Sequence, residues 1–240
     1  MKNIKYMVLV IVLAICYNCK EKKASKTISE FKELTEENRL MLIDSLTKMV
    51  EYDQSFRRMI ALGTKDSAIL KKDNEMREKP VEEYMAYRKT IISTISEAQK
   101  DSLWKLQHEL DLKNHKAFVK LVEEYGYPSK QRLKIKTDIG FEILLHPPKE
   151  IKPKIYLKKM EKLLMPEVKS KRLEPILYAQ LVDNIRQKVL KQPQLYGTNK
   201  SFNIKTMSEG LPIIEDIRET NKARKEIGLP ELNAGEYEVY

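Results

Sequence analysis

The chain has 240 residues, a formal net charge of +10 at pH 7, 42% hydrophobic residues and only 7 glycines. This length can bury the core of one medium domain or two small ones, and the few glycines beside abundant Leu, Lys, Glu and Ile indicate a mainly α-helical protein. Both cysteines lie within the first 19 residues, which excludes a disulfide-stabilised domain, so packing alone must hold the fold together.

The N-terminus has the pattern of an export signal. Lys2 and Lys5 precede Tyr6–Tyr17, a stretch of 12 residues without a charge, and charged residues resume at Lys20. A membrane-spanning helix needs about 20 apolar residues, so this stretch is too short to cross a bilayer. A basic start, a short apolar run and an abrupt polar boundary are typical of a signal peptide. An uncleaved signal anchor and a plainly secreted protein are the two alternatives.

The same segment resembles a bacterial lipoprotein signal, in which the cysteine at the cleavage point receives acyl chains. Two cysteines could fill this role: Cys16 follows Leu-Ala-Ile, and Cys19 follows Cys-Tyr-Asn. We favour Cys19, because the charged Cys-Lys-Glu-Lys-Lys start that cleavage there would leave resembles the starts of mature lipoproteins. The spacing of the two cysteines also matches a redox C-x-x-C motif, but that motif needs a βαβ setting and here lies inside the signal.

These features predict three segments: a signal peptide at 1–18, a lipidated cysteine with a polar tether at 19–35, and a helical domain at 36–240. Acyl chains would hold the domain on a membrane of the cell envelope, facing the periplasm or the cell surface, since each buried methylene contributes about 0.8 kcal/mol. The choice between inner and outer membrane stays open.

Residues that start and stop helices divide the domain into predicted elements. Thr35, followed by two glutamates, begins a helix that ends at Gly63. Pro80 and Gly126 mark later breaks. The predicted helices are 36–62, 66–77, 81–124 in two pieces that meet near residue 96, 137–145, 152–164, 173–190 and 212–227. Residues 194–206 lack helical periodicity, and we predict one short β-hairpin or extended segment there. The predicted fold class is mainly α, as a single helical domain.

The positive charge is concentrated in one part of the chain. Between Lys149 and Arg172 there are nine Lys or Arg residues and three Glu. A solvated helix face is the simplest interpretation of such a run. Only Tyr156 could stack on a base there, and the export signal also argues against nucleic acid. If the segment has a ligand, we expect an anionic glycan or lipid of the envelope.

Some polar residues fall on apolar helix stripes. Asn114 lies on one stripe with Asp111 at its border, and Asp183 lies on a later stripe. A carboxylate on a buried face needs a partner, because burying it unpaired is costly. In the structural interpretation, Asp183 pairs with Arg186 and Asn114 caps a neighbouring helix end. In the functional interpretation, these groups belong to a site.

The three histidines differ in position. His108 and His115 fall on the polar side of their predicted helix, so we expect both to be exposed to solvent. His146 ends an apolar helix just before two prolines. It could act there as an acid or base, or it could simply be stabilised by the dipole of the helix. No H-x-x-x-H pattern or Cys/His cluster is present, and no glycine-rich phosphate loop, so we expect neither a metal site nor a cofactor.

The pattern as a whole, over about residues 50 to 237, resembles an uncharacterised bacterial family. The residues that carry the resemblance are Asp53-Gln54, Arg57, Asp111, Asn114, Gly126-Tyr127-Pro128, His146, Asp183, Gln194-x-Tyr196-Gly197-Thr198, Arg224 and Gly228-Leu229. The most specific element is the Gln-x-Tyr-Gly-Thr motif. The family is a domain of unknown function often found behind signal sequences, so the resemblance implies no reaction.

The chain departs from this family at three places. The family tends to have His-Ala-Asp where this chain has His146-Pro147-Pro148, so His146 lacks a local carboxylate partner. The family tends to have Arg at Asn184 and Gln at Asn199. If these positions carry catalysis in the family, the activity of this chain would be weakened or altered.

Two hypotheses of different classes follow. The first is a lipid-anchored binding or scaffolding module of the envelope, which needs no catalytic residues. The second is a metal-independent hydrolase or lyase in which His146 is the acid or base and Asp111 or Asp183 orients it. The candidate substrate-binding residues are Asp53, Gln54, Arg57, Asn114, Gln194, Tyr196, Thr198 and Arg224. Convergence of these side chains on one cleft would favour the enzyme, and their dispersal through separate contacts would favour the module.

Overall fold

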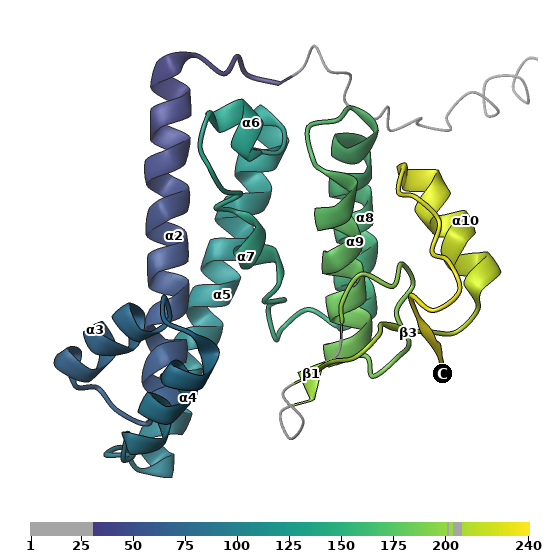
Figure 1. Ribbon diagram of the computed structural model, residues 1–240. Coiled ribbons are helices and arrows are strands. Elements are labelled where there is room, and N and C mark those ends of the chain that lie inside the picture. The colour runs from purple at the N-terminus through teal and green to yellow at the C-terminus, as the bar shows by residue number, and fades with distance from the viewer. Residues whose placement is uncertain (1–30, 201, 204–207) are drawn as a thin grey trace, which may run out of the picture. The chain divides into compact units, whose positions relative to one another are not determined.

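The computed structural model describes residues 31–200, 202–203 and 208–240 (Figure 1). The predicted signal peptide and Cys19 therefore lie outside the described residues, as does most of the predicted tether. In the described part of the chain, no helix is long and apolar enough to cross a membrane.

Two long helices pack against each other along much of their length: α2 (Glu36–Leu62) and α5 (Glu97–Tyr125) (Figure 1). Their ends follow from local sequence. The Thr35 side chain accepts a hydrogen bond from the backbone of the first turn of α2, and Gly63 ends that helix at φ 68°, a left-handed conformation that glycine adopts without strain. A capping box formed by Ser96 and Gln99 begins α5.

A helical hairpin, α3 (Ser67–Met76) and α4 (Val81–Thr90), follows α2. Asp73 of α3 is fully buried, and its charge is paired with Arg77 at 2.9 Å and Arg88 at 3.7 Å. The Tyr84 hydroxyl donates a further hydrogen bond to the same carboxylate. Because buried charges need such partners, this group ties the hairpin together.

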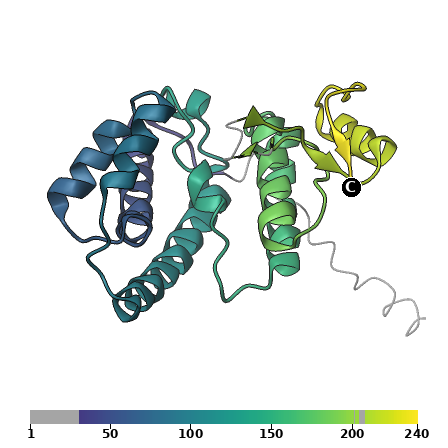
Figure 2. The same cartoon turned by 60° about the horizontal axis from the view of Figure 1, so that its bottom comes forward.

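Short helices lead from α5 to a second helical pair. They are α6 (Lys130–Leu133) and α7 (Phe141–Leu144). The second pair is α8 (Pro153–Lys169) and α9 (Pro175–Asn184), which lie side by side in both views (Figures 1 and 2). The π-helical turn η2 (Ile185–Val189) extends α9, and the last helix is α10 (Ile217–Ile227).

Two predicted helices are too long. The prediction for 137–145 is wrong except for α7, because Gly140 and the turn before it pack tightly against α5. A β-carbon at Gly140 would lie 2.3 Å from the Phe118 ring. The last helix begins at Ile217 and not near 212, because Asp216 caps its N-terminus and the residues before it form a strand.

The strands are short and form two pairs. β1 (Phe202–Asn203) pairs antiparallel with β2 (Ser208–Glu209), so the predicted hairpin is present but begins later than expected. β3 (Ile213–Ile214) pairs in parallel with β4 (Glu238–Val239) near the C-terminus, which the sequence did not predict. Two-residue strands are too short to show a period-2 pattern.

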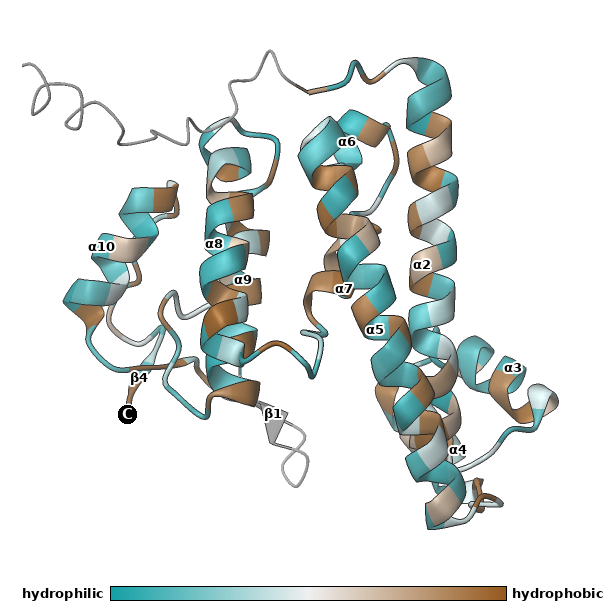
Figure 3. Cartoon of the chain, turned by 180° about the vertical axis from the view of Figure 1, so that it is seen from behind, coloured by the Kyte–Doolittle hydropathy of each residue, from teal (hydrophilic) through white to brown (hydrophobic). Residues whose placement is uncertain are grey.

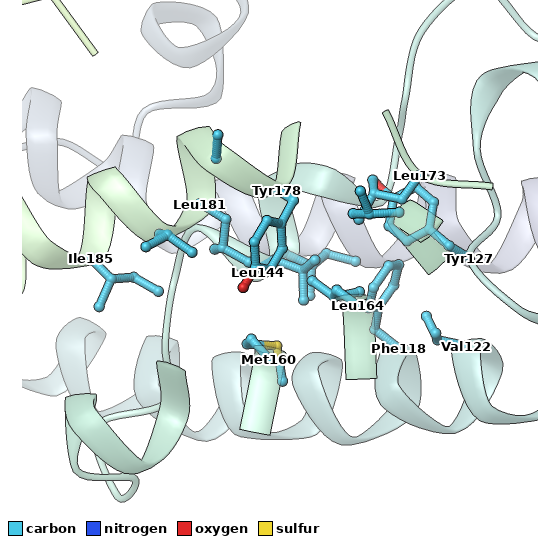
Figure 4. Packing of buried hydrophobic residues seen from close by; sticks show 14 of the residues in the cluster. Phe118, Val122, Tyr127, Leu144, Met160, Leu164, Leu173, Tyr178, Leu181 and Ile185 are labelled. Carbon is cyan, nitrogen blue, oxygen red and sulfur yellow. The ribbon is translucent and has the colours of Figure 1, made fainter. Parts of the chain in front are cut away.

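Apolar side chains from these helices and from the segments that connect them form one core (Figure 4). Apolar (brown) and polar (teal) residues are interspersed along α2, α5 and α8 (Figure 3), as expected for helices that bury one face and expose the other. The labelled core residues are Phe118, Val122, Tyr127, Leu144, Met160, Leu164, Leu173, Tyr178, Leu181 and Ile185. This single core confirms the mainly α, single-domain prediction, with Glu33–Tyr240 as one compact unit.

A buried carboxylate fixes the end of α5 against α8. Glu167 accepts two hydrogen bonds from Arg172, at 2.6 and 2.7 Å, and one from the backbone N–H of Tyr127 at 2.7 Å. Arg132 donates to the carbonyl oxygens of Tyr125 and Tyr127. The Gly-Tyr-Pro segment that follows α5 thus has a structural role in the described fold.

Candidate active site

Four charged or titratable residues from distant parts of the chain meet at one place. His146, which follows α7, places its Nδ1 3.1 Å from Oδ2 of Asp53 on α2. Arg57, one turn further along α2, lies 3.5 Å from the same oxygen and donates to Asp111 of α5 at 2.6 Å. Since α2 and α5 are packed side by side, the two carboxylates face each other across the helix interface.

The amide side chains complete this cluster. Gln54 donates to Oδ2 of Asp53 at 2.8 Å, and Gln107 donates to Asp111 at 2.7 Å. Gln107 falls on the apolar stripe of this helix one turn before Asp111, but it was not among the predicted site residues. Asn114 donates to the Met49 carbonyl oxygen on α2, so it ties α5 to α2.

The surroundings shift the pKa values of the two carboxyl groups in opposite directions. Burial by itself would raise the pKa of Asp53, but the contacts with His146 and Arg57 outweigh it, so its pKa lies below its usual value. Burial raises the pKa of Asp111 above its usual value despite the hydrogen bonds from Gln107 and Arg57. Asp53, the more acidic of the two carboxyl groups, is thus the one that faces His146.

The His146 contact has hydrogen-bond length but imperfect alignment. Nδ1 is buried and does not point directly at the Asp53 oxygen, despite the 3.1 Å separation. Such loose geometry is common in unliganded catalytic sites and tightens when substrate binds. The Asp53 side chain is buried, whereas that of His146 is 29% exposed, so Asp53 stands behind the imidazole and His146 faces outward.

A pocket of about 380 Å³ opens in front of this cluster. His146, Asp111 and Arg57 line one part of it. The remaining lining residues, His108, Leu145, Pro147, Pro148, Lys149, Ile151, Pro153 and Val189, come mainly from the segment that joins α7 to α8. The volume lies within the usual range for small-molecule sites, about 300–1,000 Å³.

The second group of predicted site residues forms a separate cluster with a structural role. Asp183 is fully buried, and its carboxylate accepts four hydrogen bonds: from the backbone N–H groups of Leu195, Tyr196 and Thr198 and from the Thr198 hydroxyl. The prediction that Asp183 pairs with Arg186 is wrong, because Arg186 donates instead to the carbonyl oxygen of Pro193. Asp183 also does not orient His146, since Asp53 occupies that position.

The other polar groups of the Gln-x-Tyr-Gly-Thr motif form hydrogen bonds with nearby residues of the fold. Gln194 exchanges two hydrogen bonds with the Asn199 backbone, at 2.6 and 2.8 Å. Arg224 of α10 donates to the carbonyl oxygen of Tyr196 at 2.6 Å, and the Tyr196 ring packs edge-on against Tyr178. These side chains stabilise the loop after η2, so the predicted substrate-binding residues divide into two clusters.

The prediction that His115 is exposed is wrong. Its side chain is 5% exposed and packs against the Tyr156 ring of α8, with ring centroids 5.1 Å apart. The helix α8 covers this face of α5, which the amphipathic pattern of α5 alone does not show. Burial and the nearby Lys159 lower the pKa of His115 to about 4.

Comparisons with models of protein families, with curated proteins and with solved structures find no match to this chain. Within the described ranges, no group of three or more His, Cys, Asp or Glu side chains is arranged to hold a metal ion. The geometry of the Asp53–His146 cluster is therefore the basis for assigning a function.

Proposed function

We propose that this protein is a metal-independent hydrolase or lyase of the cell envelope that acts on a small anionic substrate. The observation that carries this proposal is the buried Asp53 carboxylate 3.1 Å from Nδ1 of His146, at the wall of a pocket of about 380 Å³. A carboxylate behind an imidazole fixes its tautomer and stabilises its protonated form, which is the arrangement of a general base.

Each residue has a distinct role in this site. His146 accepts a proton, through Nε2, from a water molecule or from a carbon acid of the substrate. Asp111, whose pKa is raised by burial, gives its proton to the leaving group. In hydrolysis the water oxygen forms the new bond as the bond to the leaving group breaks, and solvent then returns the proton from His146 to Asp111. Asp53 does not line the pocket and is a positioning residue.

The charge of the pocket favours an anionic substrate. Arg57 and Lys149 line it beside two histidines, and Asp111, its one acidic lining residue, is paired with Arg57 at 2.6 Å. The basic stretch that begins at Lys149 thus contributes to the site, in keeping with the expected anionic envelope material. A fragment of an acidic glycan has the charge and size that these residues fit.

The orientation of His146 can be tested without a known substrate. In the full-length protein, ¹⁵N NMR of the histidine rings should find the neutral His146 proton on Nδ1, facing Asp53. The substitution Asp53→Asn should move that proton to Nε2, as the amide of the corresponding residue does in Ser-His-Asp triads. Asp44→Asn, an exposed carboxylate on the same helix, is the matched control and should change nothing. An unchanged His146 tautomer in Asp53→Asn would contradict the positioning role.

The second test measures catalytic activity. The full-length protein is assayed against chromogenic acidic glycosides, phosphate esters and carboxylate esters, and against uronic-acid glycans with detection of unsaturated products. We expect His146→Asn and Asp53→Asn each to lower kcat/KM by about 100-fold or more, while Asp44→Asn retains full activity. Binding of such glycans without turnover, and unaffected by His146→Asn, would instead support the binding or scaffolding module.

The location of this enzyme is proposed from the N-terminal pattern. We expect acyl chains on Cys19 to anchor it, after cleavage of residues 1–18. In cells fed labelled palmitate, Cys19→Ala should abolish the label and release the protein from the membrane fraction, whereas Cys16→Ala should retain both. A label that persists in Cys19→Ala would assign the lipid to another residue.

A further inference from the structure

A second hollow in the described part of the chain lies between α5 and α8. Its volume is about 510 Å³, and no residue proposed above for catalysis lines it. Its lining residues are Leu112, His115, Lys116, Val119, Glu123, Ile151, Lys159, Met160, Lys162 and Leu163. We call this hollow the His115 pocket.

The floor of the His115 pocket is apolar and elongated. Leu112 and Val119 of α5 face Met160 and Leu163 of α8 across it. The lining residues of α5 recur at intervals of three or four from Leu112 to Glu123, so the hollow follows one helix face for about 16 Å. A hollow of this length with an apolar floor matches a linear hydrocarbon chain better than a compact ring.

The rim carries net positive charge. Lys116, Lys159 and Lys162 line the pocket beside a single acid, Glu123. None of the three lysines forms an ion pair with any residue that the structure describes. Their ammonium groups are thus available to an anion placed at the end of the hollow.

One buried polar atom at this pocket lacks a partner. His115 is 5% exposed, and its Nδ1 is buried without a hydrogen bond to any described residue. Buried polar atoms are nearly always hydrogen-bonded, and the imidazole that carries this unpaired atom is one of the side chains that line the pocket. Lys159 lies close enough to lower the pKa of His115, so histidine and lysine can contact one head group.

From these observations we propose that the His115 pocket binds a single-chain fatty acid, with its alkyl chain along Leu112, Val119 and Leu163 and its carboxylate at His115 and Lys159. The apolar floor supplies affinity in proportion to chain length, and the lysine rim selects an anionic head over a neutral one. This site shares only Ile151 with the lining of the proposed catalytic pocket.

The test is a titration of the full-length Cys19→Ala protein, stripped of lipid, with dodecanoate by isothermal calorimetry. We expect saturable binding of one molecule per chain, with dodecanol at least about 10-fold weaker and octanoate weaker in proportion to its lost methylenes. Val119→Glu places a charge in the floor and should abolish binding. Lys159→Ala, a change to an exposed side chain that leaves the fold intact, should weaken binding by about 10-fold. Lys154→Ala, elsewhere on α8, should have no effect.

Several results would overturn the proposal. Dodecanoate that fails to bind, or that binds Lys159→Ala and Val119→Glu as it binds the parent protein, rules out this pocket. Binding only to vesicles that contain anionic lipid, with no saturable binding of dodecanoate, would indicate a surface attraction of the lysines. Loss of dodecanoate binding in the acylated protein, beside normal binding in Cys19→Ala, would assign the pocket to the protein's own acyl chain.

Discussion

Replacing Asp183 by Ala is expected to lower the free energy of unfolding by about 4 kcal/mol, a large share of the 5–15 kcal/mol typical of a folded domain. The buried carboxylate accepts hydrogen bonds from three backbone N–H groups and one hydroxyl, at 2.8–2.9 Å. Alanine would leave three backbone donors without this acceptor, of which that of Tyr196 is buried and those of Leu195 and Thr198 are half-buried. An unsatisfied buried donor costs about 1–3 kcal/mol, and the half-buried donors cost less because water can reach them. Urea unfolding followed by circular dichroism measures the loss.

Two further variants separate the parts of this effect. Thr198→Val removes only the hydroxyl donor, so we expect a loss of about 1 kcal/mol. Asp183→Asn keeps the size of the side chain but turns an NH₂ group toward N–H donors, so it should be nearly as damaging as Asp183→Ala. If Asp183 were instead a catalytic group, Asp183→Asn would lose activity while its unfolding curve matched the wild type.

Acid is expected to destabilise the domain through His115. The pKa of His115 in the fold is lowered from 6.5 to about 4, because burial and Lys159 disfavour the charged form. In the unfolded chain the same ring takes up a proton near pH 6.5, so stability is full above that value and falls as the pH drops toward 4. The loss from this one residue is about 3 kcal/mol when complete.

Urea unfolding at a series of pH values tests this expectation. His115→Gln cannot take up the proton, so its stability should fall by about 3 kcal/mol less than that of the wild type between pH 7 and pH 4. His108→Gln, a half-buried histidine on the same helix, is the matched control and should follow the wild type. Parallel pH curves for the wild type and His115→Gln would show that the buried ring does not control acid stability.

The long helices could be predicted because their signals are local. The caps at Thr35 and Ser96 and the left-handed Gly63 act within one or two turns of the helix that they bound. The short elements depend on distant partners: Gly140 is held by Phe118, and β3 pairs with β4 across about two dozen residues of intervening chain. Sequence periodicity carries no information about either contact.

The residues of the candidate site could be predicted from the sequence, but the contacts between them could not. Asp53, Arg57, Asp111 and His146 were all singled out, yet Asp53 was expected to bind substrate and is instead the partner of His146. These two residues come together only because α2 packs beside α5 and α7. Polar residues on apolar faces therefore identify buried groups, whereas the partner that each group finds is set by the packing of helices.

The segment that carries His146 has a further property, which concerns the unfolded chain. Three of the eight residues from His146 to Pro153 are prolines, and Pro148 is buried. Each proline that fits the native backbone stabilises a fold by about 0.4–1 kcal/mol, because the denatured chain has fewer conformations to lose. The prolines therefore limit where the His146 imidazole can lie even before the chain makes its folded contacts.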